Sequence, residues 1–450
     1  MIYQKLLNSL DFSGNIDLYL RKVEENNFNY KLIFFSSLID EILLSELQRS
    51  IRLSKTKDEV VSHLDNIKIK LVYSIEDAIN YLYEGQVILY VEGFDYFILV
   101  DIKKIPIRSL SEPETEKSIR GSKDGFNESI ITNISLIRSR IKSSKLKIEG
   151  NKVGDYTKTS VGIIYIDDKV DKVKLNKLKK KISNIDIESL VMSDRALEER
   201  LFNQNKTIFP LVRYTERPDV ASIHIMNGKI VIVVDTSPSV IITPICLLDH
   251  LKHVEEFRQT PLIGSFTKVL RIISVIVSLF LSPVVLALLT DHDYTNIFSI
   301  SLDSGNSVLA FEMIVSTIIL EIFRIAIVHT PTPLGGAISL VSALVLGQVS
   351  IDLGIFSSEV LLVVCISSIC GFATPSYELS LSNKLVSLIL LLLVAFFQME
   401  GLLIGFILLF LYLVSIKTFN VPYLYPLVPF DFKKLFRFMF RNSNEDNKNL

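Results

Sequence analysis

The sequence predicts an α/β N-terminal part followed by an α-helical membrane part with several spans. Hydrophobic residues make up 49% of the 450 residues, and the mean hydropathy is +0.39. The chain has 48 Lys and Arg and 49 Asp and Glu, yet residues 271–420 hold only four of the former and nine of the latter. A long apolar half of this kind is typical of membrane helices. These observations exclude a purely soluble enzyme and a disordered chain.

Composition also limits the function classes. The net charge of −1 gives no overall basic field for nucleic acid, and three cysteines form no disulfide framework. We find no phosphate-binding, dinucleotide-binding or nucleophile-elbow motif, so we expect no cofactor and no catalytic site. His250 and His253 lack further well-placed metal ligands. Residues 1–15 contain no continuous apolar stretch, so we expect no cleavable signal peptide and a cytosolic N-terminal part.

The first soluble segment, residues 1–105, alternates strand and helix patterns. Residues 31–36 are apolar and aromatic, and the run that follows Asp40 has helical spacing with acidic residues in its first turn. Residues 75–84 predict a second helix. Two short strands around Glu92-Gly93-Phe94-Asp95 predict a hairpin.

The same order returns in residues 151–265. A strand is predicted at 161–166 and a helix at 171–182, and Asn227-Gly228 between two apolar runs predicts a second hairpin, with strands at 221–226 and 229–235. Residues 85–92 resemble residues 228–235 position by position. We therefore interpret the two segments as related α/β subdomains, with two unrelated pieces as the alternative.

The segment between them, residues 106–150, is dense in charge. Glu116 and Arg120 would form an ion pair four residues apart if helical, and 127–141 has an amphipathic pattern. One interpretation is a solvated helical face, and the other is a docking or coupling motif that meets another subunit. The run Thr215-Glu216-Arg217-Pro218-Asp219 indicates a paired charge network rather than catalysis.

The membrane part, residues 266–420, contains six apolar runs, although between four and six of them could cross a bilayer because three are short. They are Ile272–Leu289, Val308–Val328, Leu334–Val349, Val360–Thr374, Leu385–Phe397 and Leu402–Ile416.

Loop charges favour six spans. The loops at 290–307, 350–359 and 398–401 carry acidic but no basic residues, whereas the opposite ends carry the Lys and Arg clusters. Six spans place every basic cluster inside the cell and the acidic loops outside, with both termini cytoplasmic. The tail, residues 421–450, is basic and aromatic and is expected to lie on the anionic inner leaflet.

Ionisable groups within the second apolar run are candidate pore or gate residues, because such groups are costly in a membrane. Glu321 and Arg324 are three residues apart and can pair, whereas Glu312 points to roughly the opposite helix face. A structural ion pair is the alternative. The following His329-Thr330-Pro331-Thr332-Pro333 interrupts the helix and is either a tight turn or a gating corner. Small residues then recur every fourth position and predict a helix-packing stripe, at Gly335, Ser339, Ala343 and Gly347.

Over nearly its whole length the chain resembles the A subunits of spore germination receptors. The resemblance is carried by residues of the charged segment and of the 215–219 run, which it implies are family motif or subunit-coupling positions. These are Glu112, Glu116, Arg120, Gly121, Gly125, Glu128, Asn133, Arg138, Glu216, Arg217 and Asp219. His329-Thr330-Pro331 stands where nutrient-receptor subunits usually carry Arg-Leu-Pro. This difference argues against a nutrient-sensing role.

The resemblance implies a non-enzymatic spore inner-membrane protein whose soluble part faces the core. It also implies an oligomeric ion-conducting membrane assembly that promotes ion release in germination, with a small membrane partner and other germination membrane proteins. We expect the assembly to be a homo-oligomer that conducts monovalent cations, because carboxylates lie in a membrane span. Two alternatives stay open: a nutrient-sensing receptor subunit, and a non-conducting scaffold for other spore membrane proteins.

Overall fold

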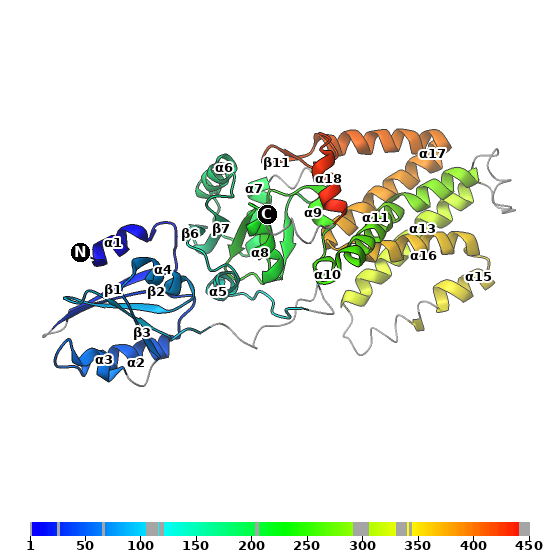
Figure 1. Cartoon of the computed structure of the whole chain (residues 1–450). Helices are drawn as coiled ribbons and strands as arrows, with labels where there is room; N and C mark the ends of the chain where they lie inside the picture. Colours follow the sequence, from blue (N-terminus) through cyan, green and yellow to red (C-terminus); the bar gives the residue numbers. More distant parts are fainter. Residues whose placement is uncertain are drawn as a thin grey trace. The chain divides into compact units, whose positions relative to one another are not determined.

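A computed structural model describes residues 2–24, 28–64, 68–104, 116, 121–202, 207–290, 306–329, 340–341 and 344–440. The chain forms two compact units, shown in sequence colours in Figure 1. The first is an α/β unit that extends to Ile245 but excludes Thr207–Leu211. The second is a helical unit that contains Thr207–Leu211 and the chain from Cys246 onward.

The first half of the α/β unit is a five-stranded antiparallel sheet with strand order β1-β2-β4-β5-β3. The predicted strand, the helix after Asp40, the helix at 75–84 and the hairpin at Gly93 are confirmed. The elements are α1 (Ile2–Ser9), β1 (Leu18–Glu24), β2 (Asn29–Phe35), α2 (Glu41–Arg52), α3 (Glu59–His63), β3 (Ile69–Val72), α4 (Ile75–Tyr83), β4 (Val87–Val91) and β5 (Phe97–Val100).

Both faces of the inner strands β2, β4 and β5 are largely buried, which explains why these strands are mostly apolar. Leu32 and Phe34 of β2 face a core that includes residues of α2 and α3, whereas Ile33 and Phe35 face a core that includes residues of α1 and α4. The alternation follows the two-residue period of a strand.

The second half of the α/β unit repeats the first element for element. Its sheet has the equivalent order, β6-β7-β9-β10-β8, and the same antiparallel pairings. The elements are α5 (Ile130–Arg140), β6 (Leu146–Val153), β7 (Thr159–Ile166), α6 (Lys172–Ser183), α7 (Ser193–Phe202), β8 (Arg213–Thr215), α8 (Pro218–Met226), β9 (Ile230–Val234) and β10 (Val240–Thr243).

Equivalent residues have the same structural roles in the two halves, as the sequence similarity between the halves predicted. Asp40 and Asp171 both accept hydrogen bonds from backbone N–H groups at the start of α2 and α6. Gly85 and Gly228 follow α4 and α8 with φ of +96° and +76°, which glycine adopts readily.

The hairpin predicted at Asn227-Gly228 is wrong, because residues 218–226 form helix α8 instead of a strand. Pro218 occupies the first helical turn, where its missing N–H is harmless, and Gly228 ends the helix in a left-handed conformation. An Asn-Gly pair serves a tight hairpin and a helix end equally well. The strand that follows, β9, agrees with the prediction.

The predicted boundary at residue 150 falls inside strand β6. Helix α5 and strand β6 belong to the second repeat and are not a linker. The segment around Asn15 joins the halves, because Ile16 donates its N–H to the Ile148 carbonyl and Ile148 donates to that of Gly14, both at 2.9 Å. Gly150 lies where a side chain would collide with Ile16.

The helical unit contains two helices long and apolar enough to cross a membrane within the described part of the chain, α11 and α17. Helix α16 is apolar but shorter. The elements are α9 (Leu247–His250), α10 (Val254–Arg258), α11 (Pro261–Thr290), α13 (Asn306–His329), η2 (Val345–Val349), α15 (Ser350–Asp352), α16 (Ser358–Phe372), α17 (Tyr377–Ser415), β11 (Lys417–Thr418), β12 (Val421–Pro422) and α18 (Phe432–Met439).

Helix α17 is two helical segments that fold back at Gln398, whose φ of +48° and ψ of −130° are not helical. This agrees with the turn predicted at 398–401. The segments pack closely because Gly401 and Gly405 lack side chains: a Cβ at Gly405 would lie 2.4 Å from Leu390. Residues of α11, α13, α16 and both segments of α17 share one apolar core.

Candidate functional site

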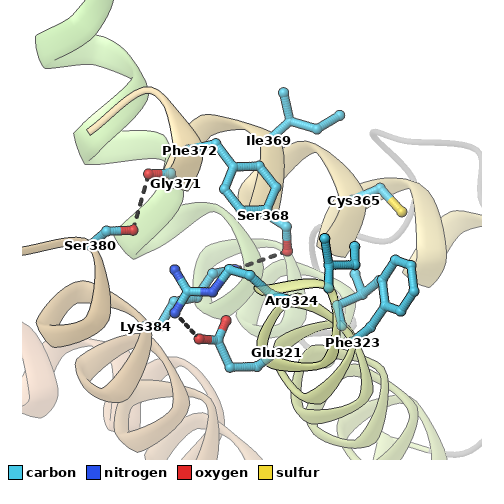
Figure 2. A pocket seen from close by; sticks show the side chains of 12 residues that line it. Glu321, Phe323, Arg324, Cys365, Ser368, Ile369, Gly371, Phe372, Ser380 and Lys384 are labelled. Carbon is cyan, nitrogen blue, oxygen red and sulfur yellow. Dashed lines mark hydrogen bonds and ion pairs between the residues drawn. The ribbon is translucent and has the colours of Figure 1, made fainter. Parts of the chain in front are cut away.

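A pocket of about 350 Å³ lies between α13, α16 and α17 of the helical unit. Its walls are mostly apolar, but three charged side chains line it, and Figure 2 shows them together. They are Glu321 and Arg324 of α13 and Lys384 of α17. Two of the sequence-predicted pore residues therefore meet a basic residue from another helix.

The three charges have unequal contacts. Arg324 forms an ion pair with Glu321, one turn earlier on the same helix, and its guanidinium lies 5.4 Å from the centre of the Tyr377 ring. Lys384 donates to the Ser368 hydroxyl of α16 at 2.9 Å (Figure 2). The Nε of Arg324 is buried and has no hydrogen-bond partner among the described residues.

Local structure explains how Lys384 reaches the pocket. Ser376 caps the first turn of α17 after the Thr374-Pro375 break, which sets the helix start. One face of α17 then approaches α16, where Ser380 donates to the Gly371 carbonyl at 3.1 Å. The Lys384 stem passes close to Gly371, and an added Cβ at Gly371 would meet it at 3.6 Å, an ordinary contact distance.

Glu312 lies outside the pocket and has a different environment. Its carboxylate accepts hydrogen bonds from the Ser357 N–H at 2.9 Å and from the Ser357 hydroxyl at 2.6 Å. Ser357 is the residue before α16, so the carboxylate sits at the positive end of that helix. This contact joins α13 to α16 and gives Glu312 a structural role.

The remaining predicted membrane residues fall mostly outside the described residues, namely Pro331, Pro333, Gly335, Ser339 and Ala343. His329 is the last residue of α13. Gly347 lies in η2, and a Cβ there would meet nothing within 4 Å in the described part of the chain. Close packing at Gly347 is therefore not observed.

Three of the predicted family-motif residues, Glu116, Arg217 and Asp219, belong to a largely buried network. Glu116 accepts from Arg213 at 2.8 Å and from the Thr215 hydroxyl. Arg217 donates to both carboxylate oxygens of Asp219 and to the carbonyls of Glu116 and Ser122. The paired network predicted at 215–219 is confirmed, whereas the solvated face is wrong for Glu116, which lies in a bend and is 6% exposed.

Other motif residues hold the chain that leads into α5. Asn133 is fully buried and exchanges two hydrogen bonds with the backbone of Asn127. The carbonyls of Glu216 and Glu128 accept from Phe126 and Thr236, respectively. Gly121 has a φ of +135° and Gly125 is buried. Glu112 and Arg120 lie outside the described residues.

Sequence reasoning missed Lys384, Arg213 and Asp17 as partners of the predicted residues. From the sequence, Lys384 is one of the basic residues expected at the inner ends of the spans, although Ser380 and Lys384 share one helix face four residues apart. Asp17 stands before the first strand with no motif around it. No local signal shows that Asp17 pairs with Arg138, because their contact depends on the tertiary fold.

The fold and site define a class: an α/β repeat unit followed by a helical unit with helices apolar enough to enter a membrane. Residues 5–449 match the Bacillus/Clostridium GerA spore germination protein family, and the chain belongs to that family.

The chain is similar to several known proteins. Stage V sporulation protein AF of Bacillus subtilis (strain 168), which segments such as 235–244 also resemble, is 36% identical over 98% of this chain and 92% of its own. Spore germination protein KA of the same organism is 29% identical over 93% and 80%. The N-terminal domain of the A subunit of the Bacillus megaterium spore germinant receptor GerK3 is 25% identical, with a TM-score of 0.39 over 54% of this chain and 91% of that chain.

Proposed function

We propose that this protein is a non-enzymatic subunit of an oligomeric ion channel in the spore inner membrane, which promotes ion release during germination. Membership of the germination family and likeness to stage V sporulation protein AF support this role. The oligomer would conduct monovalent cations, alone or with a small membrane partner protein.

The proposed topology has six spans. Helices α11, α13 and α16 and the two segments of α17 would supply five of them. The sixth is predicted from the apolar run Leu334–Val349 in the sequence. Acidic loops between the spans and basic residues at their other ends favour the α/β unit and tail on the core side. The exposed Phe432, Phe436 and Phe440 of the basic helix α18 and its C-cap suit a membrane surface on that side.

One observation carries the proposal of conduction: the charged cluster of Glu321, Arg324 and Lys384 among apolar helices. Charged groups within membrane helices are costly, and they typically mark ion pathways or hydrated cavities. The ion pair between Glu321 and Arg324 would correspond to a closed state of the channel. Lys384 lines the same pocket and would be an alternative ion-pair partner for Glu321.

Ion flux from proteoliposomes tests the proposal. We expect flux above empty liposomes from the purified protein alone or with its candidate partner, and altered conductance or selectivity in Glu321→Gln. Asp352→Asn is a matched control, because Asp352 is exposed and belongs to a predicted outer loop. If verified insertion gives no flux in either preparation, the channel role is wrong and a scaffold role is favoured.

A further inference from the structure

The charges that line the pocket do not balance. Arg324 and Lys384 are two cations, and Glu321 is one anion. Apolar side chains form most of the remaining wall. An excess positive charge in such surroundings is costly unless an anion compensates it. The described residues that line the pocket supply no second carboxylate.

The two cations also have more hydrogen-bond donors than their contacts in the pocket use. A guanidinium carries five N–H donors and an ammonium three. Arg324 uses its terminal nitrogen for Glu321, its buried Nε has no partner among the described residues, and Lys384 donates to Ser368. Donors that converge from α13 and α17 suit an anion with several oxygens, and Arg is well matched to phosphate.

The pocket opens along an apolar helix face. Ile369 and Phe372 of α16 line it and are 66% and 64% exposed. Phe323 and Ile327 of α13 continue the apolar lining. A ligand with a polar head and an apolar tail matches this distribution better than a fully solvated ion.

The position of the pocket along the helices indicates which kind of amphiphilic ligand it would bind. It is built from the last turns of α13 and α16 and the first turns of α17. In the proposed topology these turns lie at the core-side end of the membrane, where lipid head groups meet the protein. Basic pockets between membrane helices on this side are known to hold anionic lipid head groups.

We infer that this pocket binds the phosphate head group of an anionic membrane lipid, with Arg324 and Lys384 as the phosphate ligands and Ile369 and Phe372 against an acyl chain. The bound phosphate would supply the missing negative charge. The inference rests on the proposed membrane orientation but not on ion conduction.

The absence of tryptophan from the chain allows a direct test. Phe372→Trp would place a single tryptophan at the pocket mouth of the full-length protein. We expect brominated phosphatidylglycerol to quench its fluorescence more than brominated phosphatidylcholine does, with a local preference of about fivefold for one excess charge. Lys384→Met should abolish the preference, and Lys384→Arg should retain it.

Phe410→Trp is the matched control. Phe410 is exposed on the second segment of α17, and it and Lys384 lie at similar distances from Gln398 along the chain. Both brominated lipids should quench this tryptophan equally. Such equal quenching also verifies insertion, so failure of the membrane proposal is distinguishable from failure of the lipid site.

Three results would overturn the inference. The first is equal quenching of the pocket tryptophan by the two lipids. The second is an equal phosphatidylglycerol preference at Phe410→Trp, which would show a general enrichment of anionic lipid. The third is loss of the preference in millimolar inorganic phosphate, which would assign the pocket to a free anion.

Discussion

Arg138 and Asp17 form a buried two-point ion pair that joins the two repeats of the α/β unit. The Nε and a terminal nitrogen of Arg138 each lie 2.6 Å from a different oxygen of Asp17. Arg138 also donates to Asn15 and lies 4.0 Å from the centre of the Phe35 ring. The side chains of Arg138 and Asp17 are 2% and 5% exposed. The resemblance predicts Arg138 as a family-motif position, and in the structure its side chain stabilises the contact between repeats.

Asp17→Asn should therefore destabilise the α/β unit strongly. The change leaves the buried Arg138 without its counter-charge, and such losses typically cost about 3–5 kcal/mol. Thermal unfolding of the full chain, followed by circular dichroism, measures the effect. Arg138→Met in the same background should add less than it does alone, because the two residues form one interaction.

The exposed pair of Lys145 and Asp168 provides the control, since its side chains are 60% and 45% exposed. Asp168→Asn should leave the melting temperature nearly unchanged, because exposed pairs contribute little. Equal effects of Asp17→Asn and Asp168→Asn would contradict the role of the buried pair.

Gly85 and Gly228 should differ in their tolerance of alanine although they are equivalent in the repeat. Both have positive φ, which costs an alanine about 1–2 kcal/mol. A Cβ at Gly228 would in addition lie 2.6 Å from the Lys169 carbonyl oxygen, whereas one at Gly85 would meet ordinary contacts at 3.4 Å. We expect Gly228→Ala to lower the melting temperature more than Gly85→Ala does.

Gly162→Ala serves as the control for the glycine series. Gly162 lies in β7, and its nearest neighbour would be 3.6 Å from an added Cβ. This variant should be the mildest of the three. A larger loss at Gly162 than at Gly228 would show that backbone conformation does not decide the ranking.

The repeat was predictable because both halves preserve the same local signals. Asp40 and Asp171 begin equivalent helices, and Gly85 and Gly228 precede equivalent strands. The error at α8 arose because a short and mostly apolar run such as 221–226 fits a buried strand or a buried helix. The structure resolves this ambiguity through tertiary packing, since α8 lies against α5 and the second sheet.

The pH dependence of stability should report the contact between Asp11 and Lys147. A hydrogen bond from Lys147 is the main reason that the pKa of Asp11 falls from 3.8 to about 2, although partial burial opposes it. A carboxyl whose pKa is lower in the folded state stabilises the fold above its unfolded pKa. That contribution disappears as the pH falls through about 2.

The difference in melting temperature between the wild type and Asp11→Asn should therefore shrink as the pH is lowered from about 5 towards 2. In a Lys147→Met background, Asp11→Asn should produce a much smaller difference at every pH, because the main hydrogen bond is already missing. A difference that grows on acidification would have the wrong sign and would exclude this origin.

The candidate site was only half predictable. Glu321 and Arg324 stand out as charges three residues apart in an apolar run, so their pairing follows from helix geometry alone. Lys384 joins them only because the start of α17 packs against α16. This packing cannot be predicted from residue spacing in the sequence. Glu312 shows the converse: its position in a span predicted a pore role, yet Ser357 engages its carboxylate.

The turn at Gln398 should be required for the stability of the helical unit. Gln398 has a backbone conformation that glycine adopts more easily, so Gln398→Gly should raise the melting temperature in detergent. Gly401→Leu should lower it markedly, because an added Cβ would lie 2.2 Å from the Leu393 carbonyl oxygen.

Cross-linking distinguishes the folded-back arrangement from a straight helix. Leu390→Cys and Gly405→Cys, placed together in a background without native cysteines, should form a disulfide because these positions touch across the two segments. In a continuous helix the same positions would be about 22 Å apart and could not react. Efficient cross-linking that is lost in Gly401→Leu would establish that the glycine contact holds the segments together. If Leu390→Cys and Gly405→Cys form no cross-link in a protein that keeps Gln398, one long helix would be favoured. The membrane part would then have one span fewer than proposed.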